Sequence, residues 1–144
     1  MRQLATFSVQ GRTLGVDVAR VREVTRAREL TPVPLAGPSI AGLMNLRGEI
    51  VTAIDLRVRL GLPPVDADEV PGMHVVLSGA EPVSLLVDEV GDVVEVDEAS
   101  FEPPPIAVGG PAGELILGAH PRADVLLLEL DLDRALDART EGTR

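Results

Sequence analysis

The chain has 144 residues and no cysteine, so it forms no disulfide bond and offers no thiolate for metal binding or catalysis. Apolar residues make up 45% of it, with two Phe and no Trp or Tyr, which excludes a stacking surface for single-stranded nucleic acid. No apolar run approaches the roughly 18 residues of a membrane span, and no segment resembles a signal peptide. We therefore expect a cytoplasmic protein with an aliphatic core, without nucleic-acid binding or membrane insertion.

The formal net charge of −10 is unevenly distributed. All 13 basic residues are Arg; residues 1–61 hold nine of them against five acidic residues, and residues 62–144 hold four against 18. Two interpretations are open. The charges form two solvated surfaces, or they make a polar molecule whose ends attract oppositely charged partners.

The N-terminal segment shows the period of β-strands. Residues 4–9 and 14–18 alternate apolar and polar side chains, which predicts two strands joined by a turn at 10–13. Valines then recur at every third position over 18–24, which fits either a turn of helix or a kinked strand. Three prolines within 32–38 predict an extended loop.

A second hairpin follows the proline loop. Residues 40–46 and 49–56 are strand-like on either side of a turn at Arg47-Gly48. Residues 56–60 before a glycine predict a short helix.

The remainder of the chain begins with a connection rich in Pro and acidic residues, 62–72. Many short strands with frequent turn signals favour small barrels or a sandwich. The expected elements are strands at 73–78 and 82–87, a Val-rich stretch at 90–96, a Pro/Gly loop at 102–113, strands at 114–118 and 124–130, and a helix at 131–138.

The two parts of the chain resemble each other. In each, a strand pair leads to a Val-Asp step, a valine and a Glu-Val step, and later to an Asp-Leu step before a short helix: Val16-Asp17, Val21, Glu23-Val24 and Asp55-Leu56 against Val87-Asp88, Val93, Glu95-Val96 and Asp131-Leu132. This predicts two similar halves, 1–61 and 73–138, packed as one unit.

Residues suited to catalysis do not gather in the sequence. His74 lies in an apolar strand and His120 in a predicted loop, with no spacing typical of a metal site. No nucleophile elbow and no phosphate-binding loop is present. We expect no enzyme activity, no metal and no cofactor.

One short block stands out as a binding candidate. Asn45-Leu46-Arg47-Gly48 follows Gly42 and a Pro-rich loop. It is either a plain hairpin tip with a surface arginine, or a rigid turn that presents a planar donor fork to a partner's carboxylate or carbonyl groups.

Several stretches together resemble the CheW-like family, in order over residues 4–138. They are V-R-E-V (21–24), T-P-V-P (31–34), the block from Ile40 to Pro63 that contains N-L-R-G, L-L-V-D-E-V (85–90), Gly118 and L-E-L-D-L-D-R-A-L (128–136). One departure is Ser84, at a position where relatives often carry Gly.

The resemblance implies an all-β fold, with residues 1–144 as a single CheW-like domain of two intertwined five-stranded SH3-like barrels and short helices. It also implies a non-enzymatic scaffold between a CheA-type histidine kinase and the cytoplasmic tips of methyl-accepting chemoreceptors. The kinase would be bound through its own CheW-like regulatory domain, other CheW-like domains would join in rings, and the protein would be recruited to membrane-associated receptor arrays.

Family positions tied to receptor coupling or signalling match residues of this chain one by one. They are Val21, Glu23, Gly42, Arg47 and Val93, with Asn45 in the same block as a scaffold residue.

Two alternatives stay open. The first is a coupling protein for a non-flagellar chemosensory system that controls pili, gliding or development. The second, from another class, is a small-molecule-binding β-barrel, which requires a pocket with convergent polar groups.

Overall fold

The computed structural model describes residues 1–26, 28–63, 72–104 and 110–137. Within these ranges most of the chain is strand, and the helical pieces are short. The strands are β1 (Arg2–Val9), β2 (Arg12–Asp17), β3 (Val21–Arg26), β4 (Ile40–Leu46), β5 (Glu49–Asp55), β6 (Met73–Leu77), β7 (Val83–Val87), β8 (Glu89–Val96), β9 (Ile116–Pro121) and β10 (Leu126–Leu130). The helices are α1 (Leu56–Arg59), α2 (Gly110–Leu115) and α3 (Leu132–Leu136), with 3₁₀ turns η1 (Val18–Arg20) and η2 (Glu98–Ser100).

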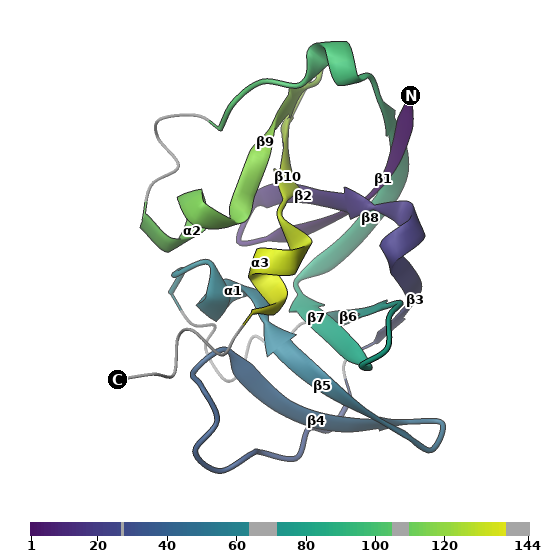
Figure 1. Ribbon diagram of the computed structural model, residues 1–144, viewed down its shortest axis with the longest axis vertical. Coiled ribbons are helices and arrows are strands. Elements are labelled where there is room, and N and C mark those ends of the chain that lie inside the picture. The colour runs from purple at the N-terminus through teal and green to yellow at the C-terminus, as the bar shows by residue number, and fades with distance from the viewer. Residues whose placement is uncertain (27, 64–71, 105–109, 138–144) are drawn as a thin grey trace.

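The strands form two five-stranded sheets, shown in the upper and lower halves of Figure 1. We call them the first barrel, with strand order β8-β1-β2-β10-β9, and the second barrel, with order β3-β6-β7-β5-β4. The first barrel takes two strands from the beginning of the chain and three from its end, and the second barrel is formed by the five strands between them, β3 to β7. The predicted all-β fold of two intertwined SH3-like barrels is confirmed.

The two sheets have equivalent strand orders. A shift of five in the strand numbers converts the order of one sheet into that of the other. Strands β1 and β2 take the places of β6 and β7, and β8, β9 and β10 take those of β3, β4 and β5. The division into halves 1–61 and 73–138 stays a prediction, and most of the connection 62–72 lies outside the described residues.

Two hairpins turn where the sequence predicts. The φ angles are 48° and 77° at Gln10 and Gly11, and 52° and 88° at Arg47 and Gly48. Positive φ at both central residues is typical of the two-residue type I′ turn, whose twist matches that of the flanking strands. The arginine of the second turn is therefore held on a backbone with little freedom.

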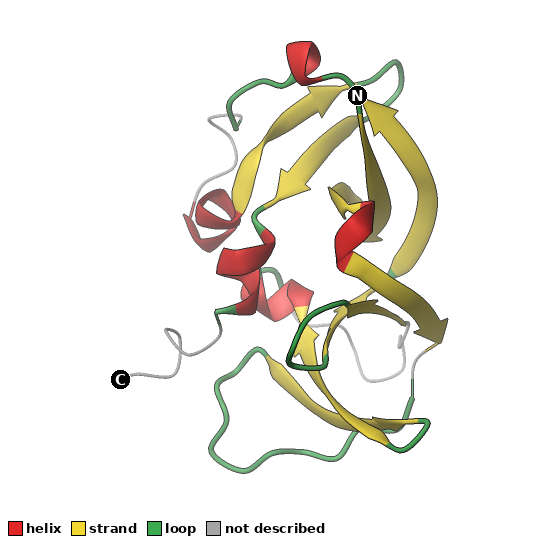
Figure 2. Cartoon of the chain, turned by 45° about the vertical axis from the view of Figure 1, so that its right-hand side comes forward, coloured by secondary structure: helices red, strands yellow, loops and turns green. Residues whose placement is uncertain are grey.

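The segment 18–24, where valines recur at every third position, contains both a helical turn and a strand. Residues 18–20 form η1, and β3 begins at Val21. The side chain of Asp17 accepts a hydrogen bond from the backbone N–H of Ala19 at 2.9 Å, which caps the 3₁₀ turn. Figure 2 shows this turn in red, where the chain leaves the first barrel for the second.

The expectation for the loop at 102–113 was wrong in its last part. Residues 110–115 form α2, so the strand expected at 114–118 begins only at Ile116. A proline in the first turn of a helix sacrifices no helical hydrogen bond, and Leu115, at the end of α2, is 2% exposed in the core. Helix is therefore not confined to the predicted pieces near 56–60 and 131–138. Residues 105–109 of the expected loop lie outside the described residues.

Both Asp-Leu steps begin helices, as the sequence predicts. Asp55 Oδ1 accepts a hydrogen bond from the N–H of Arg57 at 3.0 Å, and Asp131 Oδ1 accepts one from the N–H of Arg134 at 3.2 Å. These contacts cap α1 and α3.

One apolar core passes through both barrels. Its buried members come from both sheets and from α1, α2 and α3, which lie together beside the junction of the barrels (Figure 2). Smaller clusters lie within each barrel, around Leu4 and Leu127 in the first and around Met44 and Val51 in the second. The barrels therefore pack as one unit and share a continuous interior.

Candidate functional site

Charged side chains connect β3 to the β4–β5 hairpin, at the two edges of the second sheet. Glu23 on β3 accepts a hydrogen bond from Arg47 Nη2 on the hairpin turn. Arg22, the neighbour of Glu23, reaches Glu49 Oε1 at 2.8 Å and Glu23 Oε2 at 3.4 Å. We call the four residues the charge chain: Glu49, Arg22, Glu23 and Arg47.

The charge chain keeps Glu23 ionised. The hydrogen bond from Arg47 is the main cause that lowers the pKa of Glu23, and it outweighs the opposing effect of burial. The Glu23 side chain is 24% exposed and that of Arg47 is 64% exposed. Arg47 therefore exposes most of its side chain to solvent while one guanidinium nitrogen is held by Glu23.

Asn45 fixes the turn that carries Arg47. Its Oδ1 atom accepts a hydrogen bond from the backbone N–H of Gly48 at 2.8 Å. This contact satisfies a backbone donor at the tip of the hairpin. Asn45 thus orients the backbone on which the arginine sits.

Gly42 lies under the loop that precedes β4. Thr31 and Leu43 exchange backbone hydrogen bonds of 2.8 and 2.9 Å, so the loop runs antiparallel to the strand beside Gly42. A Cβ atom on Gly42 would come within 2.8 Å of the Thr31 carbonyl oxygen, and the φ angle of Gly42 is +150°. Both observations explain why this position carries glycine.

Gly42→Ala is expected to lower the melting temperature by about 6 °C, because overpacking costs about 2 kcal/mol and the backbone cannot yield easily. Thermal unfolding followed by circular dichroism measures the change. Ala41→Ser, at the half-buried neighbour, is the matched control and should melt close to the wild type. A Gly42→Ala protein that melts like the control would contradict this account of the glycine.

Of the two valines of the predicted site, Val21 adjoins Arg22 of the charge chain on β3, and Val93 lies apart from the charge chain. Val21 is half-buried at the start of β3 and packs against the shared core. Val93 lies on β8 in the first barrel, where it pairs with Ala5 and is 50% exposed. The structure thus gathers Glu23, Gly42, Asn45 and Arg47 on the second barrel and leaves Val93 on the first.

Ser84 has a buried partner. Its Oγ atom lies 3.1 Å from Nδ1 of His74, and both residues are fully buried in the second barrel. Burial lowers the pKa of His74, so the ring is neutral near pH 7. The departure from glycine at position 84 therefore provides a hydrogen-bond partner for a core histidine.

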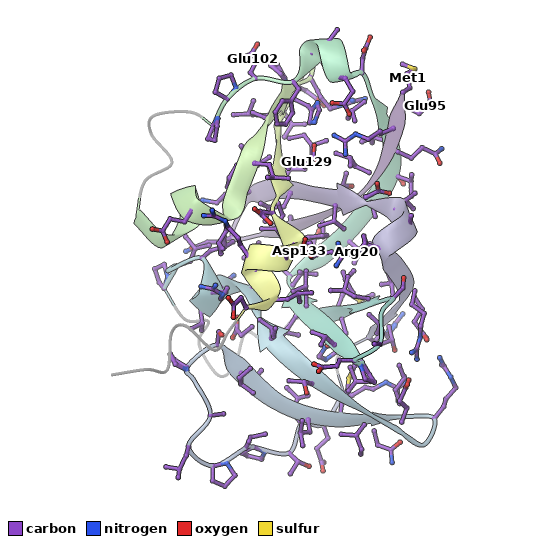
Figure 3. The ribbon with its side chains drawn as sticks, in the orientation of Figure 1. Met1, Arg20, Glu95, Glu102, Glu129 and Asp133 are labelled. Atoms are coloured by element: carbon purple, nitrogen blue, oxygen red, sulfur yellow. The ribbon has the colours of Figure 1, made fainter. Side chains whose placement is uncertain are left out.

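The first barrel contains a buried charged network that was not predicted from the sequence. Glu129 on β10 accepts two hydrogen bonds from Arg2, at 2.8 and 2.9 Å, and lies 2.9 Å from Nε2 of His120. Arg2 also binds Glu98. We call Arg2, Glu129 and His120 the Glu129 network; Figure 3 labels Glu129 within the first barrel.

The expectation that His120 lies in a loop was wrong. It lies on β9 and is 1% exposed, with its ring 5.1 Å from that of Phe101. The signal for the network was the single acidic residue in the apolar strand L-L-L-E-L (126–130). For Arg22 and Glu49, the signal was that each lies close in sequence to a site residue of opposite charge, Glu23 and Arg47 respectively.

An open depression of about 560 Å³ lies between the second barrel and α3. Among the described residues, its lining combines apolar side chains with carboxylates and includes neither histidine nor an aromatic ring: Ile40, Thr52, Ile54, Glu81, Val83, Asp133, Leu136 and Asp137. Asp133, on its rim, is paired with Arg20 at 3.3 Å, and Figure 3 shows the two labels side by side.

In the described ranges given above, no three or more His, Asp or Glu side chains come together in a way that could hold a metal ion. No helix in that part of the chain is long and apolar enough to cross a membrane.

Comparison with known proteins shows the family of this chain. The family model described as a CheW-like domain matches residues 3–140. The chain belongs to the CheW-like family. This CheW-like chain is 27% identical over 141 residues to the chemotaxis protein CheW of Treponema pallidum, covering 95% of this chain and 83% of that one. It is 32% identical over 106 residues to the chemotaxis protein CheW of Bacillus subtilis, covering 74% and 68%.

Two further relatives bear on structure and function. The crystal structure of the scaffolding protein TtCheW from Thermoanaerobacter tengcongensis superposes on this CheW-like fold with a TM-score of 0.78 and 28% identity, covering 91% of this chain and 84% of that one. Protein FrzA of Myxococcus xanthus is 31% identical over 112 residues, covering 78% and 69%.

Proposed function

We propose that this chain is a non-enzymatic scaffold that couples the cytoplasmic tips of methyl-accepting chemoreceptors to a CheA-type histidine kinase. The observation that carries the proposal is the CheW-like match over residues 3–140. The likeness of the whole fold to a scaffolding protein supports it.

The coupling surface that we propose includes the charge chain of the second barrel. Arg47 stands on a type I′ turn fixed by Asn45, and its side chain is mostly exposed. A planar fork binds carboxylates and backbone carbonyls with two donors. Gly42 shapes the strand beneath the turn, and Val21 and Val93 extend the surface toward the first barrel.

The partners that we propose follow from the family. The kinase is bound through its CheW-like regulatory domain, and other CheW-like domains join in rings. The protein is recruited to membrane-associated receptor arrays and acts without cofactor, metal or nucleic acid.

Arg47→Ala is expected to abolish most receptor coupling while the fold persists. Loss of an interface arginine costs about thirtyfold in affinity. An exposed ion pair adds little to stability, so the melting temperature should change by no more than about 2 °C. Receptor-dependent autophosphorylation of a CheA-type kinase measures coupling. Arg47→Lys should rescue only in part, since an ammonium group lacks the planar fork.

Arg122→Ala, at the end of the β9–β10 hairpin in the first barrel, is the matched control and should couple like the wild type. If Arg47→Ala melts many degrees lower while its folded fraction still couples normally, Arg47 is a structural residue of the hairpin and does not belong to the coupling surface.

The similarity to protein FrzA favours a second candidate, a coupling protein of a non-flagellar chemosensory system. Co-purification from the native cell separates the two, because the receptors and kinase that accompany the chain identify the system. Thermal-shift screening against metabolites tests the small-molecule alternative, for which a stabilising ligand should be found.

A further inference from the structure

We propose that Arg22 and Glu49 are positioning residues that hold Arg47 in the coupling surface, an inference that rests on the proposed function for its biological meaning. Neither residue was among the predicted site residues. Both are paired at the base of the turn that carries Arg47.

The Arg22–Glu49 pair joins two parts of the second barrel that are not neighbours in the sheet. Strands β3 and β4 are the two edges of the second sheet, so no backbone ladder joins them in the strand order β3-β6-β7-β5-β4. Glu49 is the first residue of β5 and pairs with Leu46 across the turn. Its 2.8 Å contact with Arg22 therefore ties the base of the hairpin to β3.

The two arginines share one oxygen of Glu23. Arg47 Nη2 and Arg22 Nε both point to Glu23 Oε2, and the Arg22 contact is the long one, at 3.4 Å. Glu49 is the stronger partner of Arg22, because its contact is 2.8 Å long against 3.4 Å for Glu23, and its hydrogen bond is also the main cause that raises the pKa of Arg22. Glu49 thus draws Arg22 away from Glu23 and leaves Oε2 to Arg47.

Loss of Glu49 reverses this balance. Arg22 then turns its whole guanidinium to Glu23, the nearest remaining carboxylate, and competes with Arg47 for the same oxygen. Arg47 loses its fixed partner although no atom in contact with it has been changed. Loss of Arg22 frees the base of the hairpin from β3.

The test uses Glu49→Gln and Arg22→Gln in the full chain. The Nε–Hε signal of Arg47 in NMR reports its order without any partner. Receptor-dependent autophosphorylation of a CheA-type kinase, with vesicles that contain a methyl-accepting chemoreceptor, reports coupling. Glu89→Gln is the matched control, because Glu89 is also the first residue of a strand, β8, but lies in the other barrel.

We expect a mobile Arg47 side chain and about a fivefold loss of coupling in both variants, with melting temperatures within about 2 °C of the wild type. Arg22→Lys keeps the charge near Glu49 and should restore part of the coupling. An Arg47 signal as ordered in Glu49→Gln as in Glu89→Gln overturns the inference. A wild type that fails to couple overturns the proposed function instead, and the NMR comparison still decides whether Arg22 and Glu49 position Arg47.

Discussion

Glu129→Ala is expected to lower the free energy of unfolding by about 3 kcal/mol, because it leaves Arg2 and His120 without their shared carboxylate inside the first barrel. The Glu129 side chain is 7% exposed, so water cannot replace the lost contacts there. The Arg2 side chain is 33% exposed and keeps its contact with Glu98, which limits the loss. Denaturant unfolding at pH 7 measures the difference, and Glu102→Ala, an exposed acidic residue, serves as the control.

The pH dependence identifies the charge as the cause. Burial raises the pKa of Glu129, but the hydrogen bonds from Arg2 and His120 outweigh it, and the net direction is downward from the ordinary value of 4.5. The stabilisation by this carboxylate is therefore complete above that value and is lost as the pH falls through the lowered pKa. The stability gap between the wild type and Glu129→Gln should stay constant from pH 7 down to about 4.5 and narrow as the pH falls further. A gap that stays constant over the whole range would show that packing alone separates the two proteins.

Gly118→Ala should cost about 3 kcal/mol, at the upper end of the range for overpacking. A Cβ atom at this position of β9 would come within 2.2 Å of the Phe101 ring and 2.5 Å of the Glu102 carbonyl oxygen. Glu102 also exchanges two backbone hydrogen bonds of 2.8 Å with Ala119, so its carbonyl cannot move without breaking them. Thermal and denaturant unfolding both measure the loss.

The double variant Gly118→Ala/Phe101→Ala separates the two contacts. It removes the ring but leaves the carbonyl in place, so we expect no recovery of stability. Full recovery would mean that only the aromatic ring excludes a side chain at position 118.

The sequence predicted most strands and both hairpins, because their signals are local. Alternating apolar residues and a glycine at the turn are sufficient for a two-residue hairpin such as the one at Arg47-Gly48. Helix α2 was missed because its Gly and Pro content is typical of a loop. It forms where Leu115 reaches the core, and that contact depends on the tertiary structure.

The residues of the candidate site could be predicted from the sequence, but the contacts between them could not. The resemblance to CheW-like domains identified Glu23 and Arg47, but the strand order is needed to see that β3 lies opposite the hairpin. The partner of Glu129 was not predictable either, because Arg2 lies 127 positions away in the sequence. A Cβ atom on Gly42 or Gly118 would lie 2.8 or 2.5 Å from a backbone carbonyl oxygen of another segment, and no local sequence pattern shows such close approaches.

The division of the strands between the barrels determines how the protein can fold. The second barrel uses five consecutive strands, β3 to β7, whereas the first combines β1 and β2 with β8, β9 and β10. Strand β1 pairs with β8 and β2 pairs with β10, near the end of the described chain. Such distant pairings give a high contact order, and folding is slow when loops this long must close before the pairs form. A ribosome must release nearly the whole chain before the first barrel can be completed, whereas the last strand of the second barrel ends at Val87. Because one apolar core passes through both barrels, the second barrel gains its full stability only when the first has closed.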